Sequence, residues 1–390
     1  MIITITELVL TLIIPLLILK YRHAKPISLI GCIGAAYLAG IIYSLAASAF
    51  FPARDTSIAE IIAYAGISVA IPLLLFSNNI KNVLRLSKST LLSFFLLIIS
   101  VMGATFLIYV LIARNIDGGG TLGGMAVALY TGGTPNLNAV ACMFQLDNEL
   151  ILTANLSDIM FGGIFYVFLT FAAKPLLSRF LKSSEKAKIT SEPGAENEND
   201  ALPFSFGNKG VIRNLLIAFM IVAVSFGIGM LIWLAKGKID GTMTNYVVPA
   251  LMIGATVGGI LLSLNKKVNS VKENDIIGQY FATVFSYSIA SIINLGKIGA
   301  VSLKIFAFYA CITTISFIIH AVLCKVFSVD ADTMIITLTA GIYGPAFIPS
   351  VSKAVKAEHL LSAGLIVGSL GYAVGTFLGM AYTYFLNFIG

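Results

Sequence analysis

The sequence predicts an all-α polytopic membrane protein built from two inverted repeats, with about ten spanning helices and two broken helical segments. The chain is 58% hydrophobic and 11% charged, with a mean hydropathy of +0.95, whereas soluble proteins carry about 25% charged residues. Its apolar runs reach the roughly 20 residues that cross a bilayer. Two of these runs are interrupted by helix-breaking residues, in corresponding positions of the two halves.

Twelve hydrophobic segments follow one another along the chain, at about 2–19, 27–50, 57–79, 89–113, 119–146, 150–173, 211–235, 244–264, 275–295, 300–327, 332–355 and 360–388. The first has no basic residue before it and no small-residue cleavage site after it, which favours a retained helix over a signal peptide. A polar stretch rich in Ser, Glu, Asn, Pro and Gly is typical of a flexible linker. The predicted domains are a first repeat, a cytoplasmic linker and a second repeat, at 1–182, 183–210 and 211–390.

The distribution of Lys and Arg indicates how the segments cross the membrane, because cytoplasmic loops carry an excess of these residues. If all twelve segments span, the basic residues divide almost equally between the two sides. If 119–146 and 332–355 are instead re-entrant hairpins, roughly three times as many basic residues lie inside as outside. We therefore predict ten spanning helices, two hairpins and both termini outside, with crossed discontinuous helices as the alternative. Each half then crosses an odd number of times, so the hairpins enter from opposite sides.

The first break lies at residues 131–138, which combine glycines, a proline, threonines and asparagines. An unpaired backbone group in a bilayer costs several kcal/mol, so a break survives only where it is buried in protein or lines a polar cavity. Its carbonyl, hydroxyl and amide groups suit a sodium ion, and a half-helix N-terminus suits a carboxylate. The alternative is a kink held by polar side chains without a ligand. The candidate site residues are Gly132, Gly133, Thr134, Asn136 and Asn138.

The second break, at residues 339–346, has a similar composition but bulkier side chains. A proline-kinked helix without a ligand is the alternative, because transmembrane segments tolerate such kinks. The pairing with the first break favours a binding site, since matched breaks mark the solute site of secondary transporters. The candidate site residues here are Thr339, Tyr343, Gly344, Pro345, Ser350 and Ser352.

Asn155 and Asp158 follow the first break and share one face of the next helix. A carboxylate within the membrane is costly and is a functional candidate by default. Asp158 is therefore predicted to bind a cation or carry a proton, with a structural hydrogen bond as the alternative. Na⁺ is the candidate ion, with Thr134, Asn136 and Asp158 as its ligands. His320 is predicted to be a hydrogen-bonded core histidine rather than a proton relay.

Several motifs are missing from the sequence. It has no G-x-x-x-x-G-K-[ST] phosphate loop, no H-E-x-x-H and no G-x-S-x-G. The four cysteines fall within apolar segments without disulfide or metal-site spacing. The net charge of +7 is attributed to residues facing the cytoplasm and its anionic lipids. We therefore expect no enzyme activity, no cofactor beyond Na⁺ and no nucleic-acid partner.

Four short motifs carry a family resemblance: residues 132–141, Ser157-Asp158, residues 344–346 and residues 368–375. With these the chain resembles the YjcL-like membrane proteins, a domain family of unknown function. That family is similar to the group of sodium/bile-acid symporters, sodium/glutamate symporters and cation–proton antiporters. The resemblance implies a panel domain and a core domain with broken helices, and a homodimer by analogy. Thr376 stands where the pattern expects asparagine, and the second break has one glycine of an expected pair.

The function predicted from these features is secondary active transport of a small anionic or zwitterionic solute, driven by Na⁺ or H⁺, in a bacterial inner membrane. Thr376 joins the second-half residues of the site. One alternative is a cation–proton antiporter that uses Asp158. Another, from a different class, is a membrane enzyme or receptor-like module, which the missing motifs disfavour. The predicted partners are the solute, the coupling ion and the lipid bilayer.

Overall fold

A computed structural model describes residues 2–22, 24–50, 56–77, 86–182, 208–237, 243–292 and 300–390. Within these ranges every regular element is helical. Eight of the described helical stretches are long and apolar enough to cross a membrane. The predicted all-α polytopic membrane fold is therefore confirmed. The predicted linker at 183–210 lies outside the described residues except for its last three positions.

Each predicted hydrophobic segment corresponds to one helix or to two or three consecutive helices. The elements are α1 (Ile2–Lys20), α2 (Lys25–Phe50), α3 (Ser57–Phe76), α4 (Lys88–Ile108), η2 (Tyr109–Ala113), α5 (Gly119–Gly132), α6 (Thr134–Met143), α7 (Asn148–Phe168), η3 (Leu169–Ala173), α8 (Lys174–Leu177), α9 (Lys209–Ile232), η4 (Trp233–Gly237), α11 (Thr244–Ser263), α12 (Lys266–Asn269), α13 (Asn274–Ser291), α14 (Ala300–Val326), α15 (Ala331–Tyr343), η6 (Pro345–Phe347), α16 (Ile348–Ala354), η7 (Glu358–Leu360) and α17 (Leu361–Ile389).

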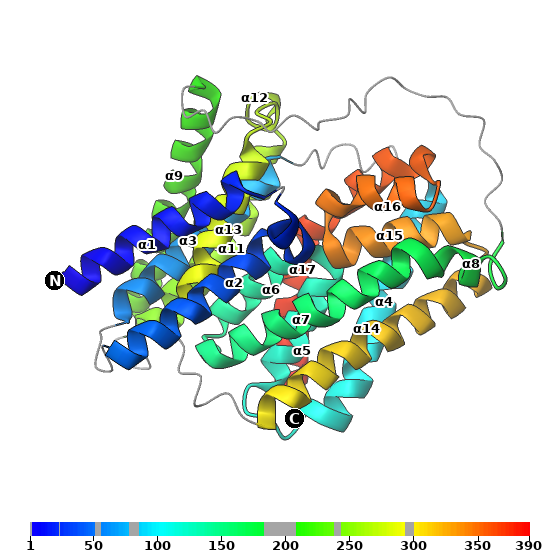
Figure 1. The fold of residues 1–390 in the computed structure, drawn as a ribbon, viewed down its shortest axis with the longest axis horizontal. Coiled ribbons are helices and arrows are strands. Elements are labelled where there is room, and N and C mark those ends of the chain that lie inside the picture. Colours follow the sequence, from blue (N-terminus) through cyan, green and yellow to red (C-terminus); the bar gives the residue numbers. More distant parts are fainter. Residues whose placement is uncertain are drawn as a thin grey trace.

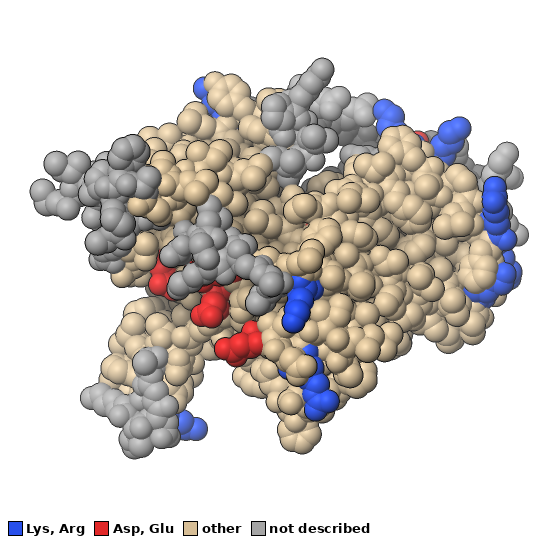
Figure 2. All heavy atoms as spheres, turned by 60° about the horizontal axis from the view of Figure 1, so that its bottom comes forward, with Lys and Arg blue, Asp and Glu red and all other residues tan. Residues whose placement is uncertain are grey.

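The helices form two bundles that lie side by side (Figure 1). The first, called here the scaffold bundle, contains α1, α2, α3, α9 and α11 to α13. The second, called the core bundle, contains α4 to α8 and α14 to α17. Most of the surface seen in Figure 2 carries no charge, and the charged side chains gather in a few groups. An uncharged surface of this extent fits a protein surrounded by lipid.

Close helix contacts hold the scaffold bundle together. Gly40 of α2 packs against α13, where a Cβ at this position would lie 2.6 Å from both Ala290 Cβ and Tyr287 O. Lipid supplies no hydrophobic force between helices, so small residues that allow close backbone approach favour association. This contact therefore depends on the absence of a side chain at Gly40.

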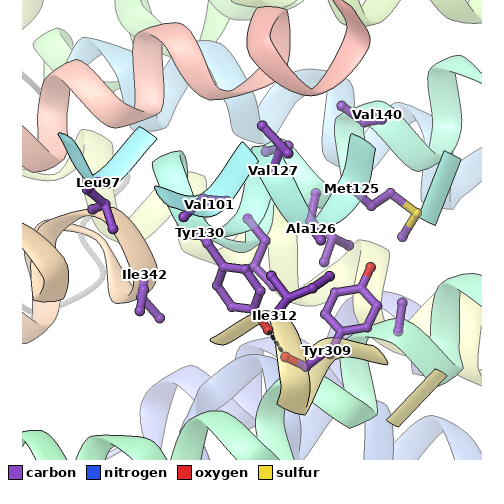
Figure 3. Packing of buried hydrophobic residues seen from close by; sticks show 14 of the residues in the cluster. Leu97, Val101, Met125, Ala126, Val127, Tyr130, Val140, Tyr309, Ile312 and Ile342 are labelled. Atoms are coloured by element: carbon purple, nitrogen blue, oxygen red, sulfur yellow. Dashed lines mark hydrogen bonds between the residues drawn. The ribbon is translucent and has the colours of Figure 1, made fainter. Parts of the chain in front are cut away.

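The centre of the core bundle is packed around α5 (Figure 3). Leu97 and Val101 of α4 lie on one side of Tyr130, and Tyr309 of α14 lies on the other. The Tyr130 and Tyr309 rings meet edge to face at 6.2 Å, and the Tyr130 hydroxyl donates to the Tyr309 carbonyl at 3.4 Å. Edge-to-face pairs add about 0.5–1.5 kcal/mol beyond their burial. These contacts fix α5 against two neighbouring helices.

The first broken segment is a hairpin whose limbs, α5 and α6, run side by side in opposite directions. A Cβ on Gly375 of α17 would lie 3.0 Å from Ala128 O in one limb and 2.8 Å from Asn136 Nδ2 in the other. Gly118, before α5, contacts Leu146, after α6. Because the two ends meet, the segment turns back at Gly133 and does not cross the bundle.

The second broken segment, α15 with η6 and α16, also turns back. Lys174 of α8 joins its two ends, because Lys174 Nζ lies 2.8 Å from Asp332 Oδ1 and donates to Val355 O at 2.6 Å. Farther along, a Cβ on Gly364 would touch Ile336 of one limb and Ile348 of the other. Both broken segments therefore fold as hairpins, which is the shape that the re-entrant arrangement requires.

The last helix, α17, lies along both hairpins. Its first half, around Gly364 and Gly368, contacts the second hairpin, and its second half, from Gly371 to Gly379, contacts the first. The hairpins therefore approach from opposite ends of α17, and their tips meet near its middle. Opposite approach is the geometry expected of inverted repeats.

Removing the Lys174 clamp should destabilise the second hairpin. Lys174→Met would leave Asp332 buried without its cation, and we expect a loss of about 2 kcal/mol. Breaking fully buried pairs costs about 3–5 kcal/mol, but the Lys174 side chain is 33% exposed. Thermal unfolding of the purified protein measures this loss. Adding Asp332→Leu should restore part of the stability, and a single variant as stable as the parent protein would contradict the clamp.

Candidate solute and ion site

The tips of the two hairpins meet at Tyr372, a half-buried residue of α17. A Cβ on Gly133 would lie 3.1 Å from Tyr372 Cε1, and a Cβ on Gly344 would lie 2.8 Å from the Tyr372 hydroxyl. Gly133 has φ 77 and ψ 174, and Gly344 has φ 75 and ψ −175. This backbone region is open essentially only to glycine. Each chain turn thus has the same conformation and faces the same tyrosine.

Asn136 joins the first tip to α17. Its Nδ2 group donates to Gly132 O at 2.6 Å, and its Oδ1 accepts a hydrogen bond from the Thr376 hydroxyl at 2.5 Å. Asn136 is 3% exposed and Thr376 is fully buried. Both ends of the Asn136 amide are therefore occupied, and the residue holds the tip in place.

The N-terminus of α6 points at the tips, but few of its N–H groups are free. The amides of Asn136 and Leu137 donate to Gly133 O at 3.1 and 3.4 Å. Pro135 has no N–H. Thr134 N–H therefore remains to face the tip region, together with the positive end of the α6 dipole.

Asn138 and Asn155 form a second polar contact, deeper along α6. Asn155 Nδ2 donates to Asn138 Oδ1 at 2.9 Å and to Ile151 O at 2.8 Å. These two acceptors fix the orientation of the Asn155 amide. Its Oδ1 is buried and has no hydrogen-bond partner in the described structure. A buried acceptor of this kind is costly to leave unpaired.

Tyr37 of α2, in the scaffold bundle, lies next to Asn138 of α6. Its side chain is fully buried, and its hydroxyl faces Ser286 and Asn138. The hydroxyl makes no hydrogen bond of normal geometry with the described residues. Polar side chains of both bundles, Tyr37 of α2 and Asn138 of α6, therefore meet where α6 contacts the scaffold bundle.

Asp158 lies on α7 near the tip of the second hairpin. Gly162 lies between the Asp158 carboxylate and the Tyr343 ring. A Cβ on Gly162 would lie 3.5 Å from Asp158 Oδ1 and 3.8 Å from Tyr343 Cε1. The Tyr343 hydroxyl donates to Gly162 O at 2.7 Å. Asp158 is half-buried and makes no ion pair or hydrogen bond with the described residues. Its carboxylate is therefore available to a cation or a proton.

The structure brings some candidate residues together and separates others. Gly132, Gly133, Asn136, Gly344 and Thr376 lie around the meeting tips, and Pro345 packs against Gly368 there. No hydrogen bond within the described residues links Asp158 to Thr134 or Asn136, and the sodium site formed by these three residues stays a prediction.

Three other candidates lie away from the tips. Thr339 is fully buried, one turn before the tip, and its hydroxyl bonds to Ile335 O within the same helix. Ser352 is buried near the open end of the hairpin, where its carbonyl accepts from Ala357 N at 2.7 Å. The side chain of Ser350 lies outside the described part.

His320 is a fully buried member of a polar contact between α14 and α4. Its Nε2 lies 3.0 Å from Ser93 O and 3.3 Å from Ser93 Oγ, which also lies 2.6 Å from Thr337 Oγ1 of α15. This contact joins three helices of the core bundle. The arrangement is that of the hydrogen-bonded core histidine expected from the sequence.

Tyr372 and Tyr37 are site residues that the sequence did not single out. Tyr372 lies within the motif at 368–375, and Tyr37 lies in a run of small residues in α2. A tyrosine in an apolar helix is common, and nothing in its spacing tells which tyrosine faces a site. The motif around Tyr372 was the one signal present.

Comparison with known proteins places this architecture in a family. Residues 16–389 match the family described as protein of unknown function DUF819. The chain is also similar to the "Uncharacterized membrane protein YjcL" of Bacillus subtilis (strain 168), with 24% identity over 332 residues that cover 80% of each chain. The family match at residues 16–389 spans both hairpins, the tips and α17. This multi-pass membrane protein belongs to the DUF819 family.

Proposed function

We propose that this protein is a secondary active transporter, set in a bacterial inner membrane, that moves a small anionic or zwitterionic solute by alternating access. The observation that carries the proposal is the meeting of two oppositely directed hairpin tips at Tyr372. Broken helices that meet in this way form the substrate and ion sites of secondary transporters. A relation to the sodium/bile-acid and sodium/glutamate symporters is part of this proposal, as is assembly into a homodimer.

The residues around the tips take separate roles in this proposal. The α6 N-terminus and Thr134 N–H face the negative group of the solute. Asp158 is the ligand of the coupling ion, because its carboxylate has no partner within the described structure. Asn136 and Thr376 hold the tip through their mutual hydrogen bond. Sodium, if it is the coupling ion, binds next to Asp158.

Relative movement of the two bundles would expose the tips to each side in turn. The polar contact at Tyr37, Asn138 and Asn155 supports such movement, because within the described residues neither the Tyr37 hydroxyl nor Asn155 Oδ1 makes a hydrogen bond of normal geometry. Leaving a buried polar group unpaired costs about 1–3 kcal/mol. This boundary is therefore less stable than an apolar one of equal area, and its separation is correspondingly easier.

Ligand-dependent stability tests the proposal. Purified protein is melted across a library of small organic anions and zwitterions, with sodium or with potassium, because a ligand that binds only the folded state raises the melting temperature. We expect stabilisation by one solute class, and loss of any sodium dependence in Asp158→Asn. Gly163→Ala, with no atom within 4 Å of the new Cβ, serves as the control. The absence of any stabilisation across the library would count against a transporter.

A cation–proton exchanger is the second candidate, and it is favoured by Asp158, whose carboxylate has no partner among the described residues. An exchanger moves protons across the membrane in one direction and a cation in the other, with no organic solute present. Liposomes that contain the protein and a pH-sensitive dye distinguish the two functions. Cation-driven proton flux that disappears in Asp158→Asn supports exchange, whereas flux that requires the organic solute supports symport.

A further inference from the structure

A basic hollow lies at one end of the scaffold bundle, where α9 begins and α12 leads into α13. Its volume is about 500 Å³, and its lining includes Arg213, Lys267, Lys272 and Glu273. It lies outside the core bundle and takes no part in the proposed transport site. Three positive side chains and one negative side chain line it, so its charge favours an anion.

Arg213 is held in a fixed position at this hollow. Its Nε and Nη2 groups lie 3.2 and 3.1 Å from Asn214 Oδ1, and Nη2 also donates to the Lys267 carbonyl. Asn214 is fully buried and donates in turn to Val268 O at 2.8 Å and to Asn274 Oδ1 at 2.9 Å. A guanidinium that is already ordered loses little conformational entropy when it binds a phosphate. The buried asparagine pair thus prepares Arg213 for an anion.

The remaining charges in the hollow do not cancel this preference. Glu273 accepts a hydrogen bond from Asn208 Nδ2 at 3.0 Å, and the Asn208 carboxamide also caps Gly210 N–H at 2.8 Å. Lys267 Nζ and Arg213 Nη1 make no hydrogen bond or ion pair within the described residues. Two donor groups therefore remain for a ligand.

An apolar stripe on α9 starts at the rim of the hollow. It consists of Ile212, Leu216, Phe219 and Met220, which are 46%, 59%, 45% and 66% exposed. Their spacing places them on one face of the helix. A ligand that fills the hollow therefore has an exposed apolar surface beside it, leading toward the membrane interior. A free soluble anion would leave that surface unused.

We propose that this hollow binds the phosphate of an anionic phospholipid, with an acyl chain lying along the α9 stripe. Arg213 and Lys267 contact the phosphate, and the stripe from Ile212 to Met220 contacts the chain. Basic pockets between helices on the cytoplasmic side are a recognised type of anionic lipid site. The predicted orientation places this hollow on that side. The lipid would attach to the scaffold bundle and leave the core bundle free to move.

Lipid titration of the full-length protein tests this proposal. Protein in a neutral detergent is titrated with short-chain phosphatidylglycerol and, separately, with the matched phosphatidylcholine. Binding is read from the rise in melting temperature and from lipid retained in native mass spectrometry. We expect saturable binding of phosphatidylglycerol, weakened about tenfold or more in Arg213→Gln/Lys267→Gln. Lys88→Gln/Lys356→Gln removes two exposed charges elsewhere on the same predicted face and should bind like the parent protein.

Two further variants keep the result interpretable if the double variant folds poorly. Lys267→Gln alters a side chain that makes no hydrogen bond in the described structure. Arg213→Lys keeps the positive charge but removes the planar guanidinium group. Both should weaken phosphatidylglycerol binding. Equal lipid retention by these variants and by the parent protein would overturn the site. Equal stabilisation by inorganic phosphate at the same concentration would overturn the lipid assignment in favour of a free anion.

Discussion

Gly133→Ala is expected to lower the free energy of unfolding by about 2–4 kcal/mol and to abolish ligand-dependent stabilisation. At φ 77 and ψ 174, a residue other than glycine is strained by about 1–3 kcal/mol. The new methyl group would also lie 3.1 Å from Tyr372 Cε1, which pushes α17 away from the tip. Thermal and chemical unfolding of the purified protein measure the first effect, and melting with the solute measures the second.

Two companion variants separate the causes of this loss. Gly163→Ala places a methyl group on α7 with nothing within 4 Å, and it should be neutral or slightly stabilising because alanine favours helix. Gly133→Ala should cost less in a Tyr372→Ala background than in the parent protein, because the contact is then absent and only the backbone strain remains. If Gly133→Ala is as stable as Gly163→Ala, the backbone at Gly133 does not have the conformation that requires glycine.

Asn136→Leu is the substitution with the second largest expected effect. It leaves Gly132 O without the donor that now lies 2.6 Å away, and it leaves the Thr376 hydroxyl without its acceptor. Each unpaired buried group costs about 1–3 kcal/mol, so we expect a total loss of about 2–4 kcal/mol. Chemical unfolding in detergent measures the loss. The first tip should also lose its fixed position against α17, and solute affinity should fall with it.

A double-mutant cycle shows whether Asn136 and Thr376 act as a pair. Asn136→Leu/Thr376→Val should be no less stable than Asn136→Leu, because the unpaired hydroxyl is removed as well. Thr383→Val on the same helix is the control, since among the described residues the Thr383 hydroxyl bonds to Gly379 O alone, one turn before it. Strictly additive losses in the cycle would show that the 2.5 Å contact contributes nothing.

The helix boundaries and the two breaks were predictable because their causes are local. Glycine and proline at 132–135 and 344–345 interrupt apolar runs that otherwise favour helix. The charge distribution then favoured hairpins, and Lys174, one of the lysines predicted to lie on the cytoplasmic side, joins both ends of the second hairpin. The direction in which a limb returns is a tertiary property, so composition alone left the crossed alternative open.

The roles of individual polar residues were less predictable. Asn136 was predicted to be a sodium ligand, and the structure adds a contact that the sequence did not predict, because its amide bonds to Gly132 O and to the Thr376 hydroxyl. An asparagine near a break can face a ligand or a carbonyl, and the sequence pattern is the same in both cases. Ser352 lies near the open end of its hairpin because the turn occurs at Gly344, well before it. The five-residue π-helical ends η2, η3 and η4 had no sequence signal.

The position of α17 has a consequence for how the chain is made. Its backbone at Gly371 packs against the Thr131 carbonyl, and its Thr376 completes the Asn136 contact. Synthesis proceeds from the N-terminus, so residues 119–143 are inserted long before the helix that supports them exists. During that interval the first tip lacks the hydrogen bond that Thr376 donates to Asn136. A chain that ends before Leu361 would therefore have both tips without the helix that supports them.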